Sequence, residues 1–373
     1  MNDFADPSPP TRSGLPRNPT IDIVRVVALL GIIVLNYHGY LNRDRALGVG
    51  QDSLFLRLMD PWNGALVVSP VLFVVVAGIS CALLTDDARR SGTARAIGEM
   101  RWVLVRRGVL LLLGGMIFEW VWPGTILPYF GTYFLLASVT FAWPSTRLML
   151  LAAATAVSAA LLSLWRYVRW THGHSTAWLS PSWIASPRDL VFRLFIDYTH
   201  PVLPWFAYFL VGTIVGRNWD RFVGRRRRSI TIALATSGVG FLVGELSLHL
   251  SGGAVQHVLS TDPFDRGLLA TGSLAALAVA LIGVITALAD RWRSTEFVRG
   301  LAAIGAMSLT MYVLHGLWFN LVVHWLEWIS PAGFDSAFAL SISTWLGLLA
   351  VARLWTTRLG RGPLERLLRG VGG

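Results

Sequence analysis

The chain of 373 residues contains no lysine and only one cysteine, Cys81. A single cysteine excludes an intrachain disulfide and leaves no thiolate cluster for a structural metal. Because all 32 basic residues are arginine, we interpret the missing lysine as codon bias without mechanistic weight. Charged residues make up only 14% of the chain, against 54% hydrophobic residues. Few soluble domains tolerate that balance, so the composition predicts a multispan membrane protein.

Motifs that would assign a familiar soluble activity are also missing. The chain has no Walker loop, no dinucleotide fingerprint and no G-x-S-x-G elbow. Its 8 histidines are scattered, and "HGH" at residues 172–174 is a short loop pattern, so no metal site is predicted. The arginines gather beside apolar runs, which does not indicate nucleic-acid binding.

Ten apolar runs predict an all-α fold, a polytopic membrane helix bundle of about ten transmembrane helices. Backbone groups in lipid must be satisfied internally, and the runs are too long for the alternating strands of a membrane barrel. The runs cover about residues 21–41, 62–84, 108–122, 126–143, 148–166, 201–216, 229–249, 267–288, 301–327 and 336–355.

The arginine-rich segments orient this bundle. Segments such as "ARRSGTARAIGEMRWVLVRR" and "RNWDRFVGRRRR" fall on one side when the spans alternate. The positive-inside rule then predicts that both termini are cytoplasmic, in the plasma (inner) membrane. Residues 1–19 are rich in proline and polar residues and lack the apolar core of a signal peptide, so we expect a flexible cytoplasmic tail. One transmembrane domain over 20–358 and a cytoplasmic tail over 359–373 would follow.

The predicted topology separates histidine from arginine. Most histidines fall at or beyond the outer ends of their helices, with Glu119 and Glu245 at similar depth, while His315 lies near the middle of its run. Ionisable groups inside a membrane are costly and usually face a site or a pathway, which favours an outward-facing polar cavity. Alternatively, these histidines only anchor the membrane interface. The outer histidines are His38, His172, His174, His200, His249, His257 and His324.

The first run, "RVVALLGIIVLNYHGY", carries polar groups at both of its ends. Arg25 and Asn36 are eleven residues apart, about three turns or roughly 16 Å, so both project from nearly the same side of a helix. His38 points away from that side if the helix stays regular. The pattern indicates a polar track across the bilayer. Alternatively, Arg25 reaches the cytoplasmic headgroups while Asn36 and His38 anchor the outer interface.

A second polar stripe occurs in "MSLTMYVLHGLWFN". Ser308, Tyr312 and His315 are spaced i, i+4 and i+7, so they share one face that should point into the bundle. Helix–helix hydrogen bonding could account for the first two, but less easily for a histidine in mid-span. Glu245 and His249 are spaced i, i+4 and could form a carboxylate–imidazole pair or a structural ion pair.

The segment "IDIVRVVALLGIIVLN" resembles the first-span signature of the YeiB-like membrane proteins and of heparan-alpha-glucosaminide N-acetyltransferase. In that signature an aspartate and an arginine precede an apolar run that ends in asparagine, which matches Asp22, Arg25 and Asn36. The resemblance covers most of the chain. Further matches, in chain order, are "PWNG", "LFVVVAGIS", "WPGTILPYFGTYFLL", "PVLPWFAYFLVG" and "LAAIGAMSLTMYVLH".

This resemblance implies a membrane acyltransferase. Such an enzyme would move an acyl group, expected to be acetyl, from cytoplasmic acyl-CoA to an amine or hydroxyl of an extracytoplasmic carbohydrate or lipid-linked envelope acceptor. Acyl-CoA would be a co-substrate, and no metal is expected. The animal enzyme has a functional histidine shortly before its "W-N-G", whereas this chain reads "RLMDPWNG" there, so His38 is a candidate replacement.

Candidate site residues follow from the polar track and the resemblance together. We expect Asn36 to bind a thioester oxyanion, His38 or His315 to act as the base, and Glu119 to be a further catalytic candidate. Arginines at the inner mouth would bind the phosphates of acyl-CoA, although the positive-inside rule alone also places them there. The acyl-CoA candidates are Arg25, Arg101, Arg106 and Arg107, and the acceptor candidates are Trp62, Asn63, His200, Trp205 and Tyr312.

Two other classes of function also fit this sequence. In a proton-coupled transporter or flippase the same buried histidines and carboxylates would form a proton relay. In a non-catalytic envelope or sensor protein the polar stripes would only hold helices together. For any of the three we expect the lipid bilayer as a partner, and a homodimer is one expectation for the assembly.

Overall fold

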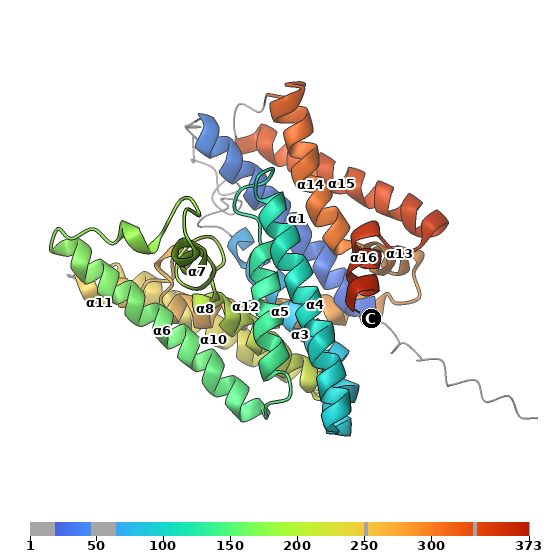
Figure 1. Ribbon diagram of the computed structural model, residues 1–373, viewed down its shortest axis with the longest axis horizontal. Helices are drawn as coiled ribbons and strands as arrows, with labels where there is room; N and C mark the ends of the chain where they lie inside the picture. Colours follow the sequence, from blue (N-terminus) through green and yellow to red (C-terminus); the bar gives the residue numbers. More distant parts are fainter. Residues whose placement is uncertain (1–18, 46–64, 250–252, 331–333, 373) are drawn as a thin grey trace, which may run out of the picture.

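The computed structural model describes residues 19–45, 65–249, 253–330 and 334–372, whose regular secondary structure is helical, with no strand (Figure 1). The predicted all-α class is therefore confirmed. The longer helices are α1 (Pro19–Arg45), α3 (Val68–Ser91), α4 (Ala94–Phe118), α5 (Leu127–Thr140), α6 (Ser145–Thr171), α8 (Val202–Arg217), α10 (Arg226–Ser247), α12 (Leu268–Arg291) and α15 (Phe334–Leu359). The shorter ones are α7 (Pro187–Phe195), α9 (Trp219–Gly224), α11 (Gly253–Val258), α13 (Glu296–Gly305), α14 (Ser308–Phe319) and α16 (Pro363–Gly372).

Nine of the ten apolar runs each overlap one of these helices, and several of the helices are long enough to cross a bilayer. Five described helices, α1, α6, α10, α12 and α15, have the length and hydropathy of a span. Helices α13 and α14 together add a sixth if the bent pair is one span. Shorter apolar helices cover Val68–Leu84 and Val202–Arg217. The total of ten spans and the cytoplasmic position of both termini stay predictions.

The run at 301–327, expected as one helix, is broken in two. Its two parts meet at an angle of 75° between Gly305 and Ser308. Gly305 lies directly against α1, and a Cβ added to it would lie 2.0 Å from the carbonyl oxygen of Asp22. The break thus occurs where the chain packs against the first helix, and it directs α14 into the bundle.

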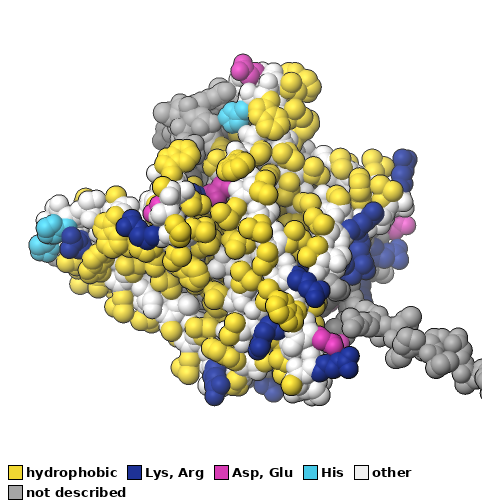
Figure 2. Space-filling view, in the orientation of Figure 1, with side chains coloured by type: hydrophobic (Ala, Val, Ile, Leu, Met, Phe, Trp, Pro, Cys, Tyr) yellow, Lys and Arg dark blue, Asp and Glu magenta, His cyan; other side chains and the backbone are white. Residues whose placement is uncertain are grey.

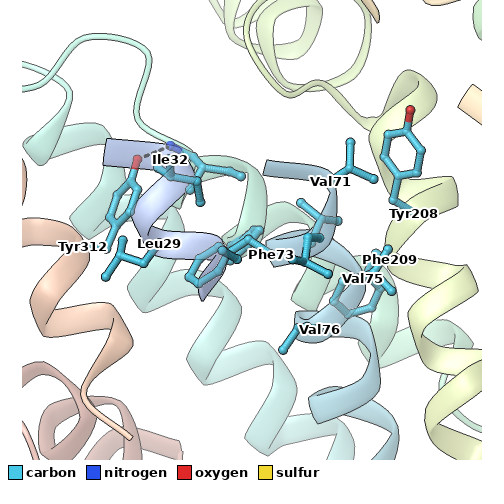
Figure 3. Packing of buried hydrophobic residues seen from close by; sticks show 14 of the residues in the cluster. Leu29, Ile32, Val71, Phe73, Val75, Val76, Tyr208, Phe209 and Tyr312 are labelled. Carbon is cyan, nitrogen blue, oxygen red and sulfur yellow. Dashed lines mark hydrogen bonds between the residues drawn. The ribbon is translucent and has the colours of Figure 1, made fainter. Parts of the chain in front are cut away.

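The core is built around α3, which packs against α1, α8 and α12, while α1 also packs against α12 to α15. Figure 3 shows valines of α3 between Leu29 of α1 and Phe209 of α8. Helices α3 and α8 approach each other so closely that a Cβ added to Gly78 would lie 2.0 Å from the carbonyl oxygen of Phe209. Only glycine permits that backbone approach.

Helices α6 and α10 form part of the apolar exterior. Only 22% of the most apolar window of each is buried, and their exposed residues include Leu150, Leu161 and Leu242. Figure 2 shows hydrophobic side chains covering much of the visible face. Arginines on that face lie mainly along its lower and right-hand edges, and histidines appear at its left and upper ends (Figure 2). An apolar exterior of this extent fits a lipid environment.

The carboxyl-terminal segment folds back onto the bundle. Helix α16 packs against α4 and α14. Its Glu365 accepts hydrogen bonds from the backbone N–H groups of Leu309 and Thr310, at 2.8 and 3.1 Å, and from the Thr310 hydroxyl at 2.5 Å. These donors belong to the first turn of α14, which no preceding residue of the helix can satisfy. The carboxylate therefore caps the helix that carries His315.

Candidate active site

Two of the predicted catalytic residues meet inside the bundle. Asn36 lies in the carboxyl-terminal half of α1, and its Nδ2 is 3.1 Å from Nε2 of His315 on α14. The histidine is fully buried. The amide and the imidazole are thus in hydrogen-bond contact within the apolar interior.

The neighbouring carbonyl group defines the role of each ring nitrogen. Nδ1 of His315 contacts the backbone carbonyl of Tyr312, one turn earlier in α14. A carbonyl oxygen can only accept, so Nδ1 carries the proton and donates. In the neutral ring Nε2 then holds the lone pair and accepts from the amide of Asn36. The nitrogen that faces Asn36 is therefore the basic one.

Aromatic side chains enclose the imidazole. The ring of Tyr37 stacks 6.1 Å from that of His315, and the rings of Trp122 and Tyr312 lie 5.3 and 4.9 Å away. The Tyr37 hydroxyl donates to the His315 carbonyl oxygen at 2.8 Å. All three aromatic residues are buried. This enclosure fixes the ring and strengthens its polar contacts, because the surroundings are poorly hydrated.

The segment between α4 and α5 lies over the same site. The hydroxyl of Tyr312 accepts from the backbone N–H of Ile126 at 3.0 Å and lies 3.2 Å from the Thr125 hydroxyl. Nδ2 of Asn320 donates to the Val121 carbonyl at 2.6 Å, and the Tyr40 hydroxyl donates to the Pro123 carbonyl. Residues 121–126 are thus attached to α1 and α14 by hydrogen bonds, which places Trp122 beside His315.

His38 is buried, two residues after Asn36 and on another side of α1. The described contacts of His315 involve Asn36 and the aromatic residues around it, not His38. Of the two histidines proposed as base, His315 is the one that a described contact joins to Asn36. The role of His38 stays a prediction.

Glu119 follows directly after α4 and pairs with Arg193 of α7. The Arg193 side chain is buried, lies 3.8 Å from the ring centre of Tyr198, and donates to the carbonyl of Ser182. Glu119 is therefore the counter-ion of a buried guanidinium at the α4–α7 contact. No described contact joins it to His315.

Arg25 lies at the opposite end of the polar face of α1. Its guanidinium is 2.5 Å from the Asp22 carboxylate and donates to the Ser80 hydroxyl, also at 2.5 Å. The first-span aspartate and arginine thus form one ion pair, attached to α3. Most of the charge of Arg25 is already balanced inside the protein.

The three arginines of α4 differ in their surroundings. Nε of Arg101 donates to the Ser138 carbonyl at 3.2 Å, which attaches α4 to α5. Arg106 is exposed, whereas Arg107 is partly buried, and its Nε is enclosed without a hydrogen-bond partner among the described residues. Arg106 and Arg107 are therefore the better placed of the three for an external anion.

His200 and Trp205 belong to a second aromatic group, which no described contact joins to the Asn36–His315 pair. Their ring centres are 4.4 Å apart, and Tyr129 lies 5.8 Å from the His200 ring. Of the acceptor candidates that the structure describes, only Tyr312 has a described contact with His315. Trp62 and Asn63 lie outside the described residues.

Among the described residues, no group of 3 or more His, Cys, Asp or Glu side chains could hold a metal ion.

Sequence reasoning missed several residues that shape this site. Tyr37 and Trp122 were not singled out as neighbours of His315, and Ser80 was not linked to Arg25. Aromatic residues are common in any membrane span, so nothing in the sequence distinguishes these two. The only signal was the position of Tyr37 next to Asn36 and of Trp122 in the "WPG" of a matching motif.

Comparison with known families gives two matches that together cover both halves of this site. The catalytic domain of heparan-alpha-glucosaminide N-acetyltransferase matches residues 17–250. The chain belongs to this family. A second family model, described as a protein of unknown function (DUF418), matches residues 218–371. Asn36 lies in the first match and His315 in the second. No curated protein matches the chain.

Family membership confirms the resemblance expected from the first-span signature and the motifs that follow it. It also indicates a membrane acetyltransferase type of function. The apolar helices of the fold agree with a membrane protein. An acyl-CoA co-substrate fits an acetyltransferase-type domain.

Proposed function

We propose that this chain is a membrane acyltransferase that moves an acetyl group from cytoplasmic acetyl-CoA to an amine or hydroxyl of an extracytoplasmic carbohydrate or lipid-linked acceptor. The observation that carries the proposal is the contact of 3.1 Å between Nδ2 of the partly buried Asn36 and Nε2 of the buried His315. A basic imidazole nitrogen next to an amide donor offers the two groups that acyl transfer needs, a base and an oxyanion donor.

The reaction begins when the acceptor N–H or O–H replaces Asn36 at Nε2 of His315. Nε2 takes the acceptor proton as the acceptor atom forms its bond to the thioester carbonyl carbon. The Asn36 amide then donates to the oxyanion of the tetrahedral intermediate. Collapse of the intermediate breaks the carbon–sulfur bond, and the proton on Nε2 passes to the leaving thiolate. The products are the acetylated acceptor and free coenzyme A.

Tyr312 and Trp122 prepare the histidine for this role. The Tyr312 carbonyl accepts from Nδ1, which keeps the lone pair on Nε2, and the indole of Trp122 lies edge-on, 5.3 Å from the imidazole ring. A ring fixed in this way loses little freedom in the transition state. The aromatic enclosure also excludes water, which would otherwise hydrolyse the thioester.

The donor would approach from the arginine-rich end of the bundle. Arg106 and Arg107 of α4 offer guanidinium groups for phosphate, and guanidinium can bind phosphate through two parallel hydrogen bonds. Helix α16 packs against α4 and brings Arg366 to this part of the bundle. Arg25 at the start of α1 is held by Asp22 and Ser80, so its part is to keep the inner end of α1 in place.

The test uses purified protein in sealed vesicles, with acetyl-CoA labelled on the acetyl group outside and a glucosamine derivative inside. Acetylated amine inside the vesicles would support the proposal. Glucosamine leaving the vesicles without acetylation would identify a transporter, and label that stays on acetyl-CoA would contradict acyl transfer. Vesicles without protein measure spontaneous acetylation.

A further inference from the structure

Three polar residues from separate segments meet near the carboxyl-terminal end of α6. Oγ of Ser163 on α6 is 2.9 Å from Nε2 of His257 on α11. Nδ1 of the same histidine is 3.8 Å from the Asp265 carboxylate of the 3₁₀ turn η3 (Pro263–Asp265). A hydroxyl, an imidazole and a carboxylate therefore follow one another in the order found at serine nucleophiles.

The carboxylate favours one arrangement of protons. An anion beside Nδ1 of His257 stabilises the proton on that nitrogen, which leaves the lone pair on Nε2 facing Ser163. The Ser163 hydroxyl also contacts the backbone carbonyl of Asp265. The single proton of this hydroxyl therefore has two acceptors within reach, the carbonyl and Nε2. A rotation of the hydroxyl directs the proton from the carbonyl to Nε2 of His257.

The three residues line open space, not a packed interior. Two cavities of about 760 and 480 Å³ both include Tyr167, His257 and Asp265 in their walls, and the smaller one also includes Ser163. The ring of Tyr167 stacks 4.6 Å from that of His257. Ser163, Arg166 and Tyr167 are spaced i, i+3 and i+4 on α6, so all three face the smaller cavity. A substrate could reach the hydroxyl from this side.

Charge near the serine suits a developing oxyanion. Arg166 and Arg266 both pair with the single carboxylate of Asp197, so this cluster keeps one positive charge in excess. Both arginines line the smaller cavity with Ser163. Burial lowers the pKa of Arg266, and the neighbouring Asp197 opposes that shift. Both guanidinium groups also donate to fixed partners, Arg166 to Ser180 and Arg266 to the carbonyls of Ile196 and Tyr198. Their positive charge, held in place in this way, would stabilise an acyl oxygen that becomes negative.

The cavity walls also indicate the kind of molecule that would enter. Aromatic rings of Trp170 and Phe264, both exposed, lie beside the smaller cavity, while Glu245, Gln256 and Asp262 line the larger one. Flat apolar faces next to carboxylate and amide groups suit a carbohydrate, whose ring stacks and whose hydroxyls donate and accept. An acyl ester on a sugar hydroxyl combines that ring with the carbonyl group that a serine attacks.

We infer that Ser163, His257 and Asp265 form a second reaction centre, an esterase site that removes acyl groups from the hydroxyls of a carbohydrate. Ser163 Oγ bonds to the ester carbonyl carbon while its proton moves to Nε2 of His257. The carbon–oxygen bond to the sugar then breaks, and His257 returns the proton to the sugar oxygen. Water then bonds to the acyl carbon and gives one proton to His257. The bond between that carbon and Ser163 Oγ breaks, His257 returns the proton to Oγ, and the carboxylic acid leaves.

This site shares no residue with the Asn36–His315 pair, and its reaction uses no acyl-CoA. It therefore goes beyond the proposed acetyl transfer, and its tests give an answer whether or not acetyl transfer occurs. Ser163 precedes His257 by 94 residues and Asp265 by 102 residues, so no local sequence motif contains all three.

The test is covalent labelling of the purified full-length protein with a fluorophosphonate, which reacts with activated serines, followed by peptide mass spectrometry. The label is expected on Ser163. Hydrolysis of an O-acetylated methyl glucoside is expected to fall by about 10²–10⁴-fold in Ser163→Ala and in His257→Ala. Asp265→Asn should lower both labelling and hydrolysis while it preserves the shape of the side chain.

Ser158→Ala is the matched control, because Ser158 is exposed on the same helix. It should keep both the label and the hydrolysis rate of the unmodified protein. Thermal unfolding of each variant shows whether the fold is intact, and Asp265→Asn provides the answer if Ser163→Ala does not fold. Absence of label at Ser163, or unchanged hydrolysis in a folded Ser163→Ala protein, would overturn the esterase site.

Discussion

The amide of Asn36 on α1 and the imidazole of His315 on α14 are in contact across 279 residues of chain, with 3.1 Å between Nδ2 and Nε2. The contact joins the two regions that match different family models. It also lies in an aromatic enclosure, where an unmatched polar group would be costly. A pair of this kind is expected where a function requires it, and the proposed acetyl transfer provides one.

Reporter fusions test the orientation of the bundle. Fusions after residues 95, 222 and 295 should read cytoplasmic, because arginine-rich segments surround these points. Fusions near residues 175 and 257 should read outside. An alkaline phosphatase and a fluorescent-protein reporter at each point provide opposite signals. The inverted pattern would place His315 and the arginines on the wrong sides for the proposed reaction.

The donor end is tested by removing two charges from α4. Changing both Arg106 and Arg107 to Gln should raise the KM for acetyl-CoA, with less effect on the KM for the acceptor, because only the donor carries phosphates. Steady-state kinetics with each substrate varied in turn measure both constants. Arg95→Gln is the control, since Arg95 is exposed at the start of the same helix and pairs with Glu99. An unchanged KM for acetyl-CoA in the double variant would remove both arginines from the donor site.

The carboxyl-terminal cap has a measurable effect on stability. Glu365→Ala should lower stability by about 0.5–2 kcal/mol, because two backbone N–H groups of α14 and the Thr310 hydroxyl lose their acceptor. Thermal unfolding in detergent measures this as a lower midpoint. Asp87→Ala, which changes an exposed carboxylate of α3, should have little effect. Equal midpoints for the two variants would show that the cap contributes nothing.

His200, in the loop between α7 and α8, makes stability depend on pH. Desolvation, with the nearby charge of Arg266, lowers the pKa of His200 from 6.5 to about 3. Between pH 6.5 and 3 the histidine is protonated in the unfolded chain but stays neutral in the folded protein. The free energy of unfolding therefore has its full value above pH 6.5 and falls as the pH drops toward 3. In His200→Gln the unfolding midpoint should fall less between pH 7.5 and 5 than in the unmodified protein. Parallel curves for the two proteins would contradict the lowered pKa.

The sequence was sufficient for the class of fold and for the elements that carry the site. Apolar runs and their period predict helices well, because lipid leaves few other structures for the backbone. Asn36 and His315 could be selected one by one, since each is a polar group inside an apolar run. Their contact could not be predicted, because the packing of α1 against α14 depends on contacts between distant segments.

Other features of the structure could not be predicted from the sequence. Glu119 was a catalytic candidate in the sequence, but the structure pairs it with Arg193, which lies 74 residues further on. The break after Gly305 followed from a close approach of two backbones, which hydropathy does not register. Ser163, His257 and Asp265 were missed as a group because serine is common in helices and no spacing links the three.

The most direct test of the account is the turnover of His315→Ala with labelled acetyl-CoA, measured beside His324→Ala. His324 is exposed and follows α14 on the same segment, so its variant should keep normal turnover. Loss of the base should lower turnover by about 10²–10⁴-fold, and Asn36→Ala should lower it by about 10²–10³-fold, while acetyl-CoA still binds. Near-normal turnover in correctly folded His315→Ala protein would contradict the central claim that the Asn36–His315 pair is the reaction centre.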